Sequence, residues 1–313
     1  MVNLKPFMKY LNGFFHFFSS MDNYQLIPQD NNIEPKNWTM IIRPQRRWYD
    51  FHLDDLWRYR DLIKLFVKRD FVAYYKQTIL GPLWYLIQPI ISTIVFTIIF
   101  GNIAKIPTDG MPPFLFYLAG QTVWSYFSTC FISTSNTFVA NAGIFGKVYF
   151  PRMSVPISVI LSNLISFGIR FGMFLLFWLY YWISGSTINP NLWALYLPLL
   201  VLLMALMGLG FGIITSSLTT KYRDLQQLIS FGVQLLMYAT PVVYPLSTVS
   251  GIWRTLILLN PMTPVIEIFR LGFLGVSDIN PIWLCYTGAF TLIILFIGLS
   301  LFNKVEASFM DTV

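Results

Sequence analysis

LWALYLPLLVLLMALMGLGFGIITSSL, residues 192–218, contains no charged residue and no histidine, and it exceeds the roughly 20 apolar residues that cross a bilayer as a helix. Similar charge-free runs cover 77–104, 110–146, 153–169, 171–220, 225–253 and 279–303. Hydrophobic residues make up 56% of the chain and charged residues only 11%. A soluble protein of this length does not need long uncharged apolar segments to form its core, so the sequence predicts an all-α membrane protein.

The runs predict six transmembrane helices. A polar turn sequence at residues 184–191 divides the run 171–220 between two of them. The predicted spans are about 79–103, 114–140, 157–182, 192–218, 226–243 and 281–302. Two G-x-x-x-G pairs, Gly168 with Gly172 and Gly208 with Gly212, predict close helix packing, within one subunit or at a dimer seam.

The distribution of Lys and Arg predicts the orientation in the membrane. Seventeen of the 21 basic residues fall in the terminal segments and in the loops on one side of the predicted spans, against three on the other side. By the positive-inside rule both termini are cytoplasmic. The formal net charge of +7 is thereby explained by topology, and no nucleic-acid partner is expected.

The predicted spans lack the groups that ion coupling and catalysis need. No Asp or Glu occurs between Asp109 and Asp224, and both histidines, His16 and His52, lie outside the spans. An ion-coupled transporter normally keeps ionisable groups at membrane depth. The string at 143–148 lacks the spacing and the hydroxyl of a phosphate-binding loop, and no hydrolase or zinc-protease motif occurs. The sequence predicts no catalytic, cofactor or metal site in this chain, so energy must come from another chain.

Residues 1–50 form a predicted cytoplasmic extension, and residues 51–313 a membrane domain. Apolar residues from Leu4 to Phe18 follow the helical period opposite a stripe that contains Lys5 and Lys9. Such a helix lies on the membrane surface or packs on a partner protein. After a polar linker at 21–47, a second amphipathic segment at about 54–70 places Leu56, Tyr59, Ile63 and Phe66 on one face.

Seven pieces of sequence, in order, resemble the polysaccharide-export permeases of bacterial ATP-binding cassette (ABC) transporters, the type-two exporters. They are YKQTILGPLWYLIQP (75–89), AGQTVWSYF (119–127), NAGIFGKVYFPRMSVPIS (141–158), KYRDLQQLI (221–229), TPVVYPLS (240–247), LNPMTPVIEIFR (259–270) and FNKVEASF (302–309). The resemblance covers about 53–313. It implies a bacterial inner-membrane homodimer that exports lipid-linked O-antigen, capsule or teichoic-acid chains. It also implies two copies of a separate ATPase subunit that hold ATP and magnesium.

The resemblance further implies three working parts. The segment at 54–70 is similar to the cytoplasmic interface helix of the family. The loop with Lys147, Tyr149, Phe150, Pro151 and Arg152 is similar to the coupling helix that docks on the ATPase; the alternative is a solvated basic loop. Residues 244–275 are similar to the short outer re-entrant gate helices. Their apolar pieces, 255–259 and 265–274, are too short to span a bilayer.

Two sets of intramembrane residues are candidates for substrate contact. Aromatic side chains can stack on sugar faces and donate hydrogen bonds from their polar tips, so a glycan path is expected among them. The candidates, for which packing or lipid contact is the alternative, are Tyr117, Trp124, Tyr126, Phe127, Tyr238 and Tyr244. Arg170 lies within the third predicted span, where an unpaired charge is costly. It is expected to pair with Glu267, to bind a substrate diphosphate, or to reach water.

The predicted function is therefore that of the permease subunit of a lipid-linked polysaccharide exporter. An ABC exporter of a lipid or a drug shares this architecture and remains the alternative. An ion-coupled transporter or a membrane-bound transferase fits less well, because both need ionisable residues near the spans.

Overall fold

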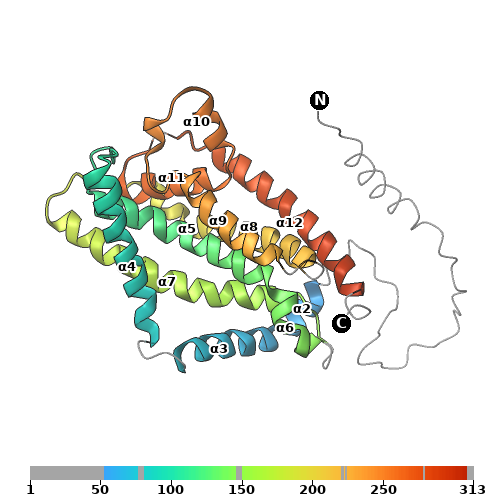
Figure 1. Cartoon of the computed structure of the whole chain (residues 1–313). Coiled ribbons are helices and arrows are strands. Elements are labelled where there is room, and N and C mark those ends of the chain that lie inside the picture. The colour runs from blue at the N-terminus through green and yellow to red at the C-terminus, as the bar shows by residue number, and fades with distance from the viewer. Residues whose placement is uncertain are drawn as a thin grey trace, which may run out of the picture. The chain divides into compact units, whose positions relative to one another are not determined.

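The computed structural model describes residues 53–76, 81–145, 150–219, 222, 224–277 and 279–308. In these residues every regular element is helical (Figure 1). The helices are α2 (Leu53–Arg58), α3 (Arg60–Lys76), α4 (Trp84–Phe96), α5 (Pro113–Ser135), α6 (Thr137–Phe145), α7 (Ser154–Ile183), α8 (Leu197–Thr219), α9 (Leu225–Tyr238), α10 (Gly251–Leu258), α11 (Met262–Leu274) and α12 (Trp283–Ser308). Shorter turns are η2 (Gly81–Leu83), η3 (Thr97–Ile103), η4 (Leu192–Tyr196) and η5 (Leu246–Thr248). The predicted N-terminal extension, Lys147 and Tyr149 lie outside the described residues.

α5 is the central helix of the bundle. It lies between α7 and α8 and also contacts α4, α9 and α11 (Figure 1). Most of its 23 residues are buried. Hydroxyl side chains are tolerated on it because they donate to backbone carbonyls one turn earlier, as Thr122 Oγ1 does to Leu118 O at 2.7 Å. A helix covered by other helices needs less apolar surface than one that faces lipid.

Four helical segments are long and apolar enough to cross a membrane, judged by length and composition among the described residues. They are Trp84–Ile103, Ser154–Ile183, Leu192–Thr219 and Trp283–Val305. α10 and α11 make a fifth if they count as one span, although their axes bend by 92°. The sequence predicted six spans. α5 has the length but carries many polar residues, and α9 has only 14 residues.

One of the two predicted glycine pairs packs helices closely within the chain. A Cβ atom added at Gly208 would lie 2.7 Å from Cys130 Cβ, and one at Gly212 would overlap Thr134. α8 therefore approaches α5 more closely than any larger residue allows. At Gly168 and Gly172 an added Cβ would meet no atom of the described chain within 4 Å.

We expect Gly212→Ala to lower the stability of the protein by about 1–3 kcal/mol, because the added methyl group overpacks the contact with Thr134. The matched control is Gly172→Ala, which adds the same methyl group in open space and is expected to be neutral or slightly stabilising, since alanine favours helices. Thermal unfolding of the two variants in detergent provides the measurement. Equal midpoints would contradict the close approach of α8 to α5.

Candidate functional sites

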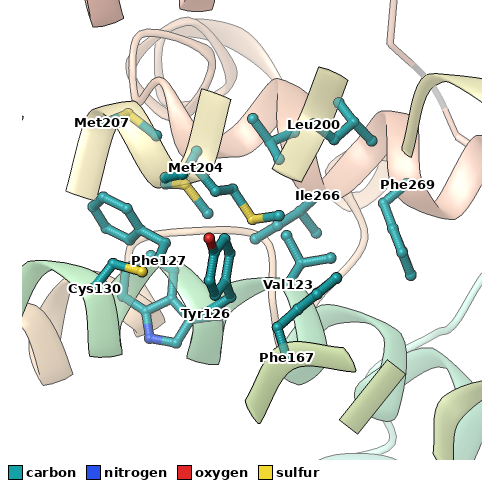
Figure 2. Close-up of a cluster of buried hydrophobic side chains, with 14 of the residues drawn as sticks. Val123, Tyr126, Phe127, Cys130, Phe167, Leu200, Met204, Met207, Ile266 and Phe269 are labelled. Atoms are coloured by element: carbon teal, nitrogen blue, oxygen red, sulfur yellow. The ribbon is translucent and has the colours of Figure 1, made fainter. Parts of the chain in front are cut away.

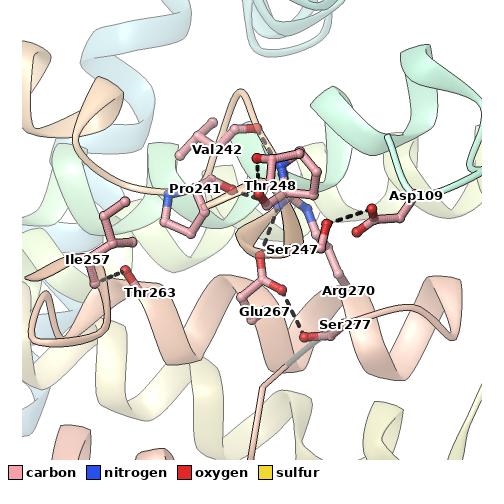
Figure 3. A network of polar contacts seen from close by, with 11 residues as sticks. Asp109, Pro241, Val242, Ser247, Thr248, Ile257, Thr263, Glu267, Arg270 and Ser277 are labelled. Atoms are coloured by element: carbon pink, nitrogen blue, oxygen red, sulfur yellow. Dashed lines mark hydrogen bonds and ion pairs between the residues drawn. The ribbon is translucent and has the colours of Figure 1, made fainter. Parts of the chain in front are cut away.

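α11 carries a buried ion pair. The side chains of Arg270 and Glu267 are both about 2–3% exposed, and Arg270 Nη1 lies 3.2 Å from Glu267 Oε1. The two residues face each other because they are three positions apart on one helix. Ser277 Oγ donates to the second carboxylate oxygen of Glu267 at 2.8 Å (Figure 3). The carboxylate thus has a partner at each oxygen, as a buried charge requires.

Arg270 also joins α11 to the segment that follows α9. Its Nη1 donates to Pro241 O at 2.6 Å and its Nη2 to Val242 O at 2.8 Å (Figure 3). The guanidinium carbon lies 3.7 Å from the centre of the Phe116 ring on α5. A Cβ atom at Gly120 would lie 2.9 Å from Nη2, so α5 leaves room for the guanidinium. One side chain therefore connects α5, α11 and the chain after α9.

Further polar contacts hold the same segment, residues 239–250. Ser247 Oγ donates to Asp109 Oδ1 at 2.7 Å, and Asn260 Nδ2 donates to Thr240 Oγ1 at 2.8 Å (Figure 3 shows the first). We name these contacts and those of Arg270 and Glu267 the α11 network. Their combined effect is to fix residues 239–250 against α11 and against the chain before α5.

The C-terminal end of α11 is held by α7 and by the chain between α7 and α8. Asn191 N donates to Gly272 O at 2.8 Å, and Trp178 Nε1 donates to Phe273 O at 2.7 Å. Gly275 ends the helix at φ 81°, a left-handed conformation that suits glycine, with Asn189 directly against it. α10, by contrast, has no buried residue. α11 is thus a fixed part of the bundle, whereas α10 has much of its surface exposed.

The expected pairing of Arg170 with Glu267 is wrong. Glu267 is occupied by Arg270 and Ser277, whereas the guanidinium carbon of Arg170 on α7 lies 5.7 Å from the centre of the Tyr85 ring on α4. The physical reason is that Arg270 stands one turn from Glu267 on the same helix, closer than any residue of another span. Whether Arg170 contacts a substrate phosphate stays a prediction.

Most of the aromatic residues predicted for the substrate path lie in the core. Tyr117, Trp124, Tyr126 and Phe127 are all buried, and Figure 2 shows Tyr126 and Phe127 among methionine and aliphatic side chains of α8. Tyr238 is exposed and Tyr244 is half-buried. Phe127 and Tyr244 both line an open groove of about 620 Å³ that α5, α8, α9 and α10 border. We name it the apolar groove, since nearly all its lining side chains are hydrocarbon.

The predicted interface helix is α3 with the preceding α2, and it packs by the expected face. Ile63 and Phe66 are buried, and Leu56 and Tyr59 are half-buried. The Phe66 ring lies 5.7 Å from the Phe150 ring, measured between centroids. α3 is therefore attached to the predicted coupling loop itself, at Phe150.

Phe150 belongs to a continuous group of rings, which we name the aromatic cluster. The centroids of Phe145 and Phe150 are 5.7 Å apart, those of Phe138 and Phe145 6.0 Å, and those of Phe138 and Phe302 4.7 Å. The cluster links α3, α6, the chain at Phe150 and the end of α12. Phe150 is buried within this chain, although the resemblance implies that its loop docks on the ATPase.

The two other described residues of the predicted coupling loop also pack against other parts of this chain. Arg152 is buried, with its guanidinium carbon 5.7 Å from the centre of the Phe145 ring, and Pro151 is half-buried. On the exposed face of α3, the Lys64 ammonium group holds the pKa of Asp61 below its usual value through a hydrogen bond. Among the described residues no group of three or more His, Cys, Asp or Glu side chains could hold a metal ion.

Comparison with known proteins places this architecture in a family. Residues 61–274 match the family model described as ABC-2 type transporter. The chain belongs to the ABC-2 type transporter family.

Its relatives within that family are similar over most of their length. The O-antigen export system permease protein RfbA of Klebsiella pneumoniae is 27% identical over 256 residues, which are 80% of this chain and 94% of the relative. RfbA of Myxococcus xanthus is 28% identical, over 83% of this chain and 98% of the relative. The polysialic acid transport protein KpsM of Escherichia coli is 26% identical, over 74% and 89%.

The ABC-2 match contains the α11 network except Ser277 and the aromatic cluster except Phe302, since it begins in α3 and ends with α11. Sequence reasoning missed Arg270 as a member of this site. The signal was present in the spacing of Glu267 and Arg270, which puts opposite charges one helical turn apart. Gly120 gave no comparable signal, because its role depends on an arginine 150 positions away.

Proposed function

We propose that this ABC-2 type chain is the permease subunit of an ATP-driven exporter of a lipid-linked polysaccharide of the O-antigen, capsule or teichoic-acid type. The observation that carries the proposal is its similarity to O-antigen export permeases that it covers almost entirely. The lack of a phosphate-binding loop in the sequence supports a separate ATPase subunit. ATP and magnesium would be held there.

In this proposal two copies of the chain and two ATPase subunits assemble in the bacterial inner membrane, with both termini cytoplasmic. α5 and α9 would complete the six spans, since they line the interior of the assembly and need not face lipid. Lys147, Tyr149, Phe150, Pro151 and Arg152 would form the region that docks on the ATPase. The aromatic cluster would carry movement from that region to α3 and α12, because packed rings move together.

α10 and α11 would form the outer gate. The 92° bend lies between an anchored helix and a largely exposed one. We propose that α10 moves about residues 259–261 while α11 stays with α5. The apolar groove beneath α10 supports contact with the hydrocarbon part of a lipid-linked substrate. An exporter of a lipid or a drug would use the same groove, so the test below also distinguishes that alternative.

The test is deletion of this chain in its own bacterium, with complementation by the wild type. Loss of surface polysaccharide with cytoplasmic accumulation of the lipid-linked chain supports the proposal. Unchanged surface polysaccharide with an altered lipid profile or drug sensitivity would favour the alternative instead. Co-purification tests the predicted docking region. The tagged chain is expected to bring down an ATPase subunit, and a permease that lacks residues 146–152 is expected not to do so.

A further inference from the structure

α5 carries a row of polar side chains on the one face that the bundle leaves partly open. The row, which we name the polar row of α5, consists of Gln121, Ser125, Ser128 and Thr129 on the helix and Asn136 directly after its last residue, with Ile132 among them, all half-buried. At about 3.6 residues per turn these positions fall within about 100° of the helix circumference. The row extends about 22 Å along the helix, most of the roughly 30 Å of a bilayer core.

α9, which contacts α5, carries a second polar surface. The buried side chain of Val233 marks the face of α9 that packs on the bundle. Leu236 and Ala239, on one flank of α9, line the apolar groove. Helix geometry places Gln227, Ser230 and Gln234 on the opposite flank, and all three are exposed. We name these three the polar flank of α9. The helix thus separates an apolar surface from a polar one.

The hydroxyl groups of the row keep acceptors available, whereas Gln121 Oε1 accepts from Thr93 Oγ1 of α4 at 3.2 Å and Asn136 Oδ1 is buried. Thr129 Oγ1 donates to Ser125 O at 2.6 Å, and Ser128 Oγ donates to the same carbonyl at 3.2 Å. Each hydroxyl proton is therefore used within the helix, while the oxygen lone pairs stay available. Gln227 and Gln234 add amide donors and acceptors. Exposed amides are costly in hydrocarbon, so this surface suits water or a partner rich in hydroxyl groups better than lipid tails.

We infer that the polar row of α5 and the polar flank of α9 form the track along which the sugar chain moves, and that this chain is neutral. The inference rests on the proposed function and deepens it. Sugar hydroxyl groups both donate and accept, so they match the available hydroxyl oxygens of the row and the amides of α9. None of the eight polar positions is charged. An acidic polymer taken from water would require basic partners along such a path.

A matched pair of substitutions on α5 tests the contact. Thr129→Val and Thr122→Val each remove one hydroxyl group that donates to the carbonyl four residues earlier, but Thr122 is buried in the bundle. Thr129→Val is expected to slow export about fivefold, equivalent to one hydrogen bond of about 1 kcal/mol, with Thr122→Val close to wild type. Equal export rates in the two variants at equal protein levels would overturn the contact.

Thiol labelling tests the surface independently of any single hydrogen bond. In a background with Cys130→Ala and Cys285→Ala that still exports, Ser125→Cys and Ser128→Cys are treated with a membrane-impermeant maleimide. The control is Leu292→Cys, on the exposed apolar face of α12. Only the thiolate reacts, and it forms where water reaches the sulfur, so the α5 cysteines should react at least about tenfold faster. Labelling no faster than at Leu292→Cys would overturn the track.

The charge of the exported polysaccharide tests the second part of the inference, that the sugar chain is neutral. Compositional analysis of the surface polysaccharide lost on deletion is expected to find neutral sugars without carboxylate or phosphate in the repeat. An acidic repeat would overturn the neutral assignment even if labelling succeeds. The two hypotheses fail in different ways. If the proposed function is wrong, deletion of the chain leaves the surface polysaccharide unchanged. If only this inference is wrong, deletion still abolishes export, but the α5 cysteines are not labelled or the repeat is charged.

Discussion

Arg270→Met is expected to lower the stability of the protein by about 3–5 kcal/mol, the usual cost of removing one partner of a buried ion pair. The substitution would leave the Glu267 carboxylate buried with only Ser277 as a partner. It would also remove the donors to Pro241 and Val242, so residues 239–250 would lose their attachment to α11. The measurement is the midpoint of thermal unfolding in detergent, with export as a second readout.

Two further variants show whether the charge or the shape of Arg270 is responsible. Arg270→Met combined with Glu267→Gln is expected to recover part of the stability, because the uncompensated charge is then gone. Lys64→Met breaks the exposed pair with Asp61 on α3 and should leave the midpoint unchanged. An Arg270→Met variant as stable as Lys64→Met would contradict the network.

Arg270 also shows the limit of reasoning from charge in a membrane sequence. Glu267, on the predicted outer re-entrant segment, was one of three partners expected for Arg170, beside a substrate diphosphate and water. Local geometry decided otherwise, since Glu267 and Arg270 are neighbours on one helical turn. The distribution of basic residues placed Arg270 on the outer side, within the predicted gate helices at 244–275. The sequence predicted a short helix there, but it did not predict that the 13 residues of α11 are almost all buried in the bundle.

The sequence predicted element type better than it predicted which face of an element is used. The length and apolarity of the runs that contain α7, α8 and α12 are sufficient to indicate long helices. The aromatic residues of α5 could not be assigned from composition, because Trp124 and Tyr126 look alike in a core and in a channel. The contacts of α5 on several sides decide that they are buried. The same contacts leave the serine and threonine row as the open face.

Glycine pairs illustrate the same limit. Gly208 and Gly212 have the same spacing as Gly168 and Gly172, and the sequence predicts close packing at both. Only the first pair faces a neighbouring helix of this chain, at Cys130 and Thr134 of the α5 region. The spacing places two small residues on one face of a helix. Which neighbouring helix that face contacts depends on how the whole bundle assembles.

Phe150→Ala is expected to separate ATP hydrolysis from export while the ATPase still binds. The ring of Phe150 is buried against Phe66 and Phe145, so its removal leaves a cavity inside the permease and costs about 3–5 kcal/mol of stability. α3 would then lose its attachment to the end of the predicted docking region. Because the ring does not project from the chain, co-purification of the ATPase subunit should persist. ATPase activity and export in reconstituted vesicles provide the measurement.

Conservative and surface variants separate this effect from general damage. Phe150→Leu keeps most of the buried volume and is expected to retain most export, since volume-conserving changes cost less. Trp57→Ala removes a large but exposed ring on α2 and should leave thermal stability unchanged. Loss of ATPase co-purification in Phe150→Ala, with an unaltered unfolding midpoint, would mean that the ring docks on the partner after all. A lowered midpoint with the ATPase still bound indicates that the aromatic cluster couples the docking region to α3 and α12 from inside the permease.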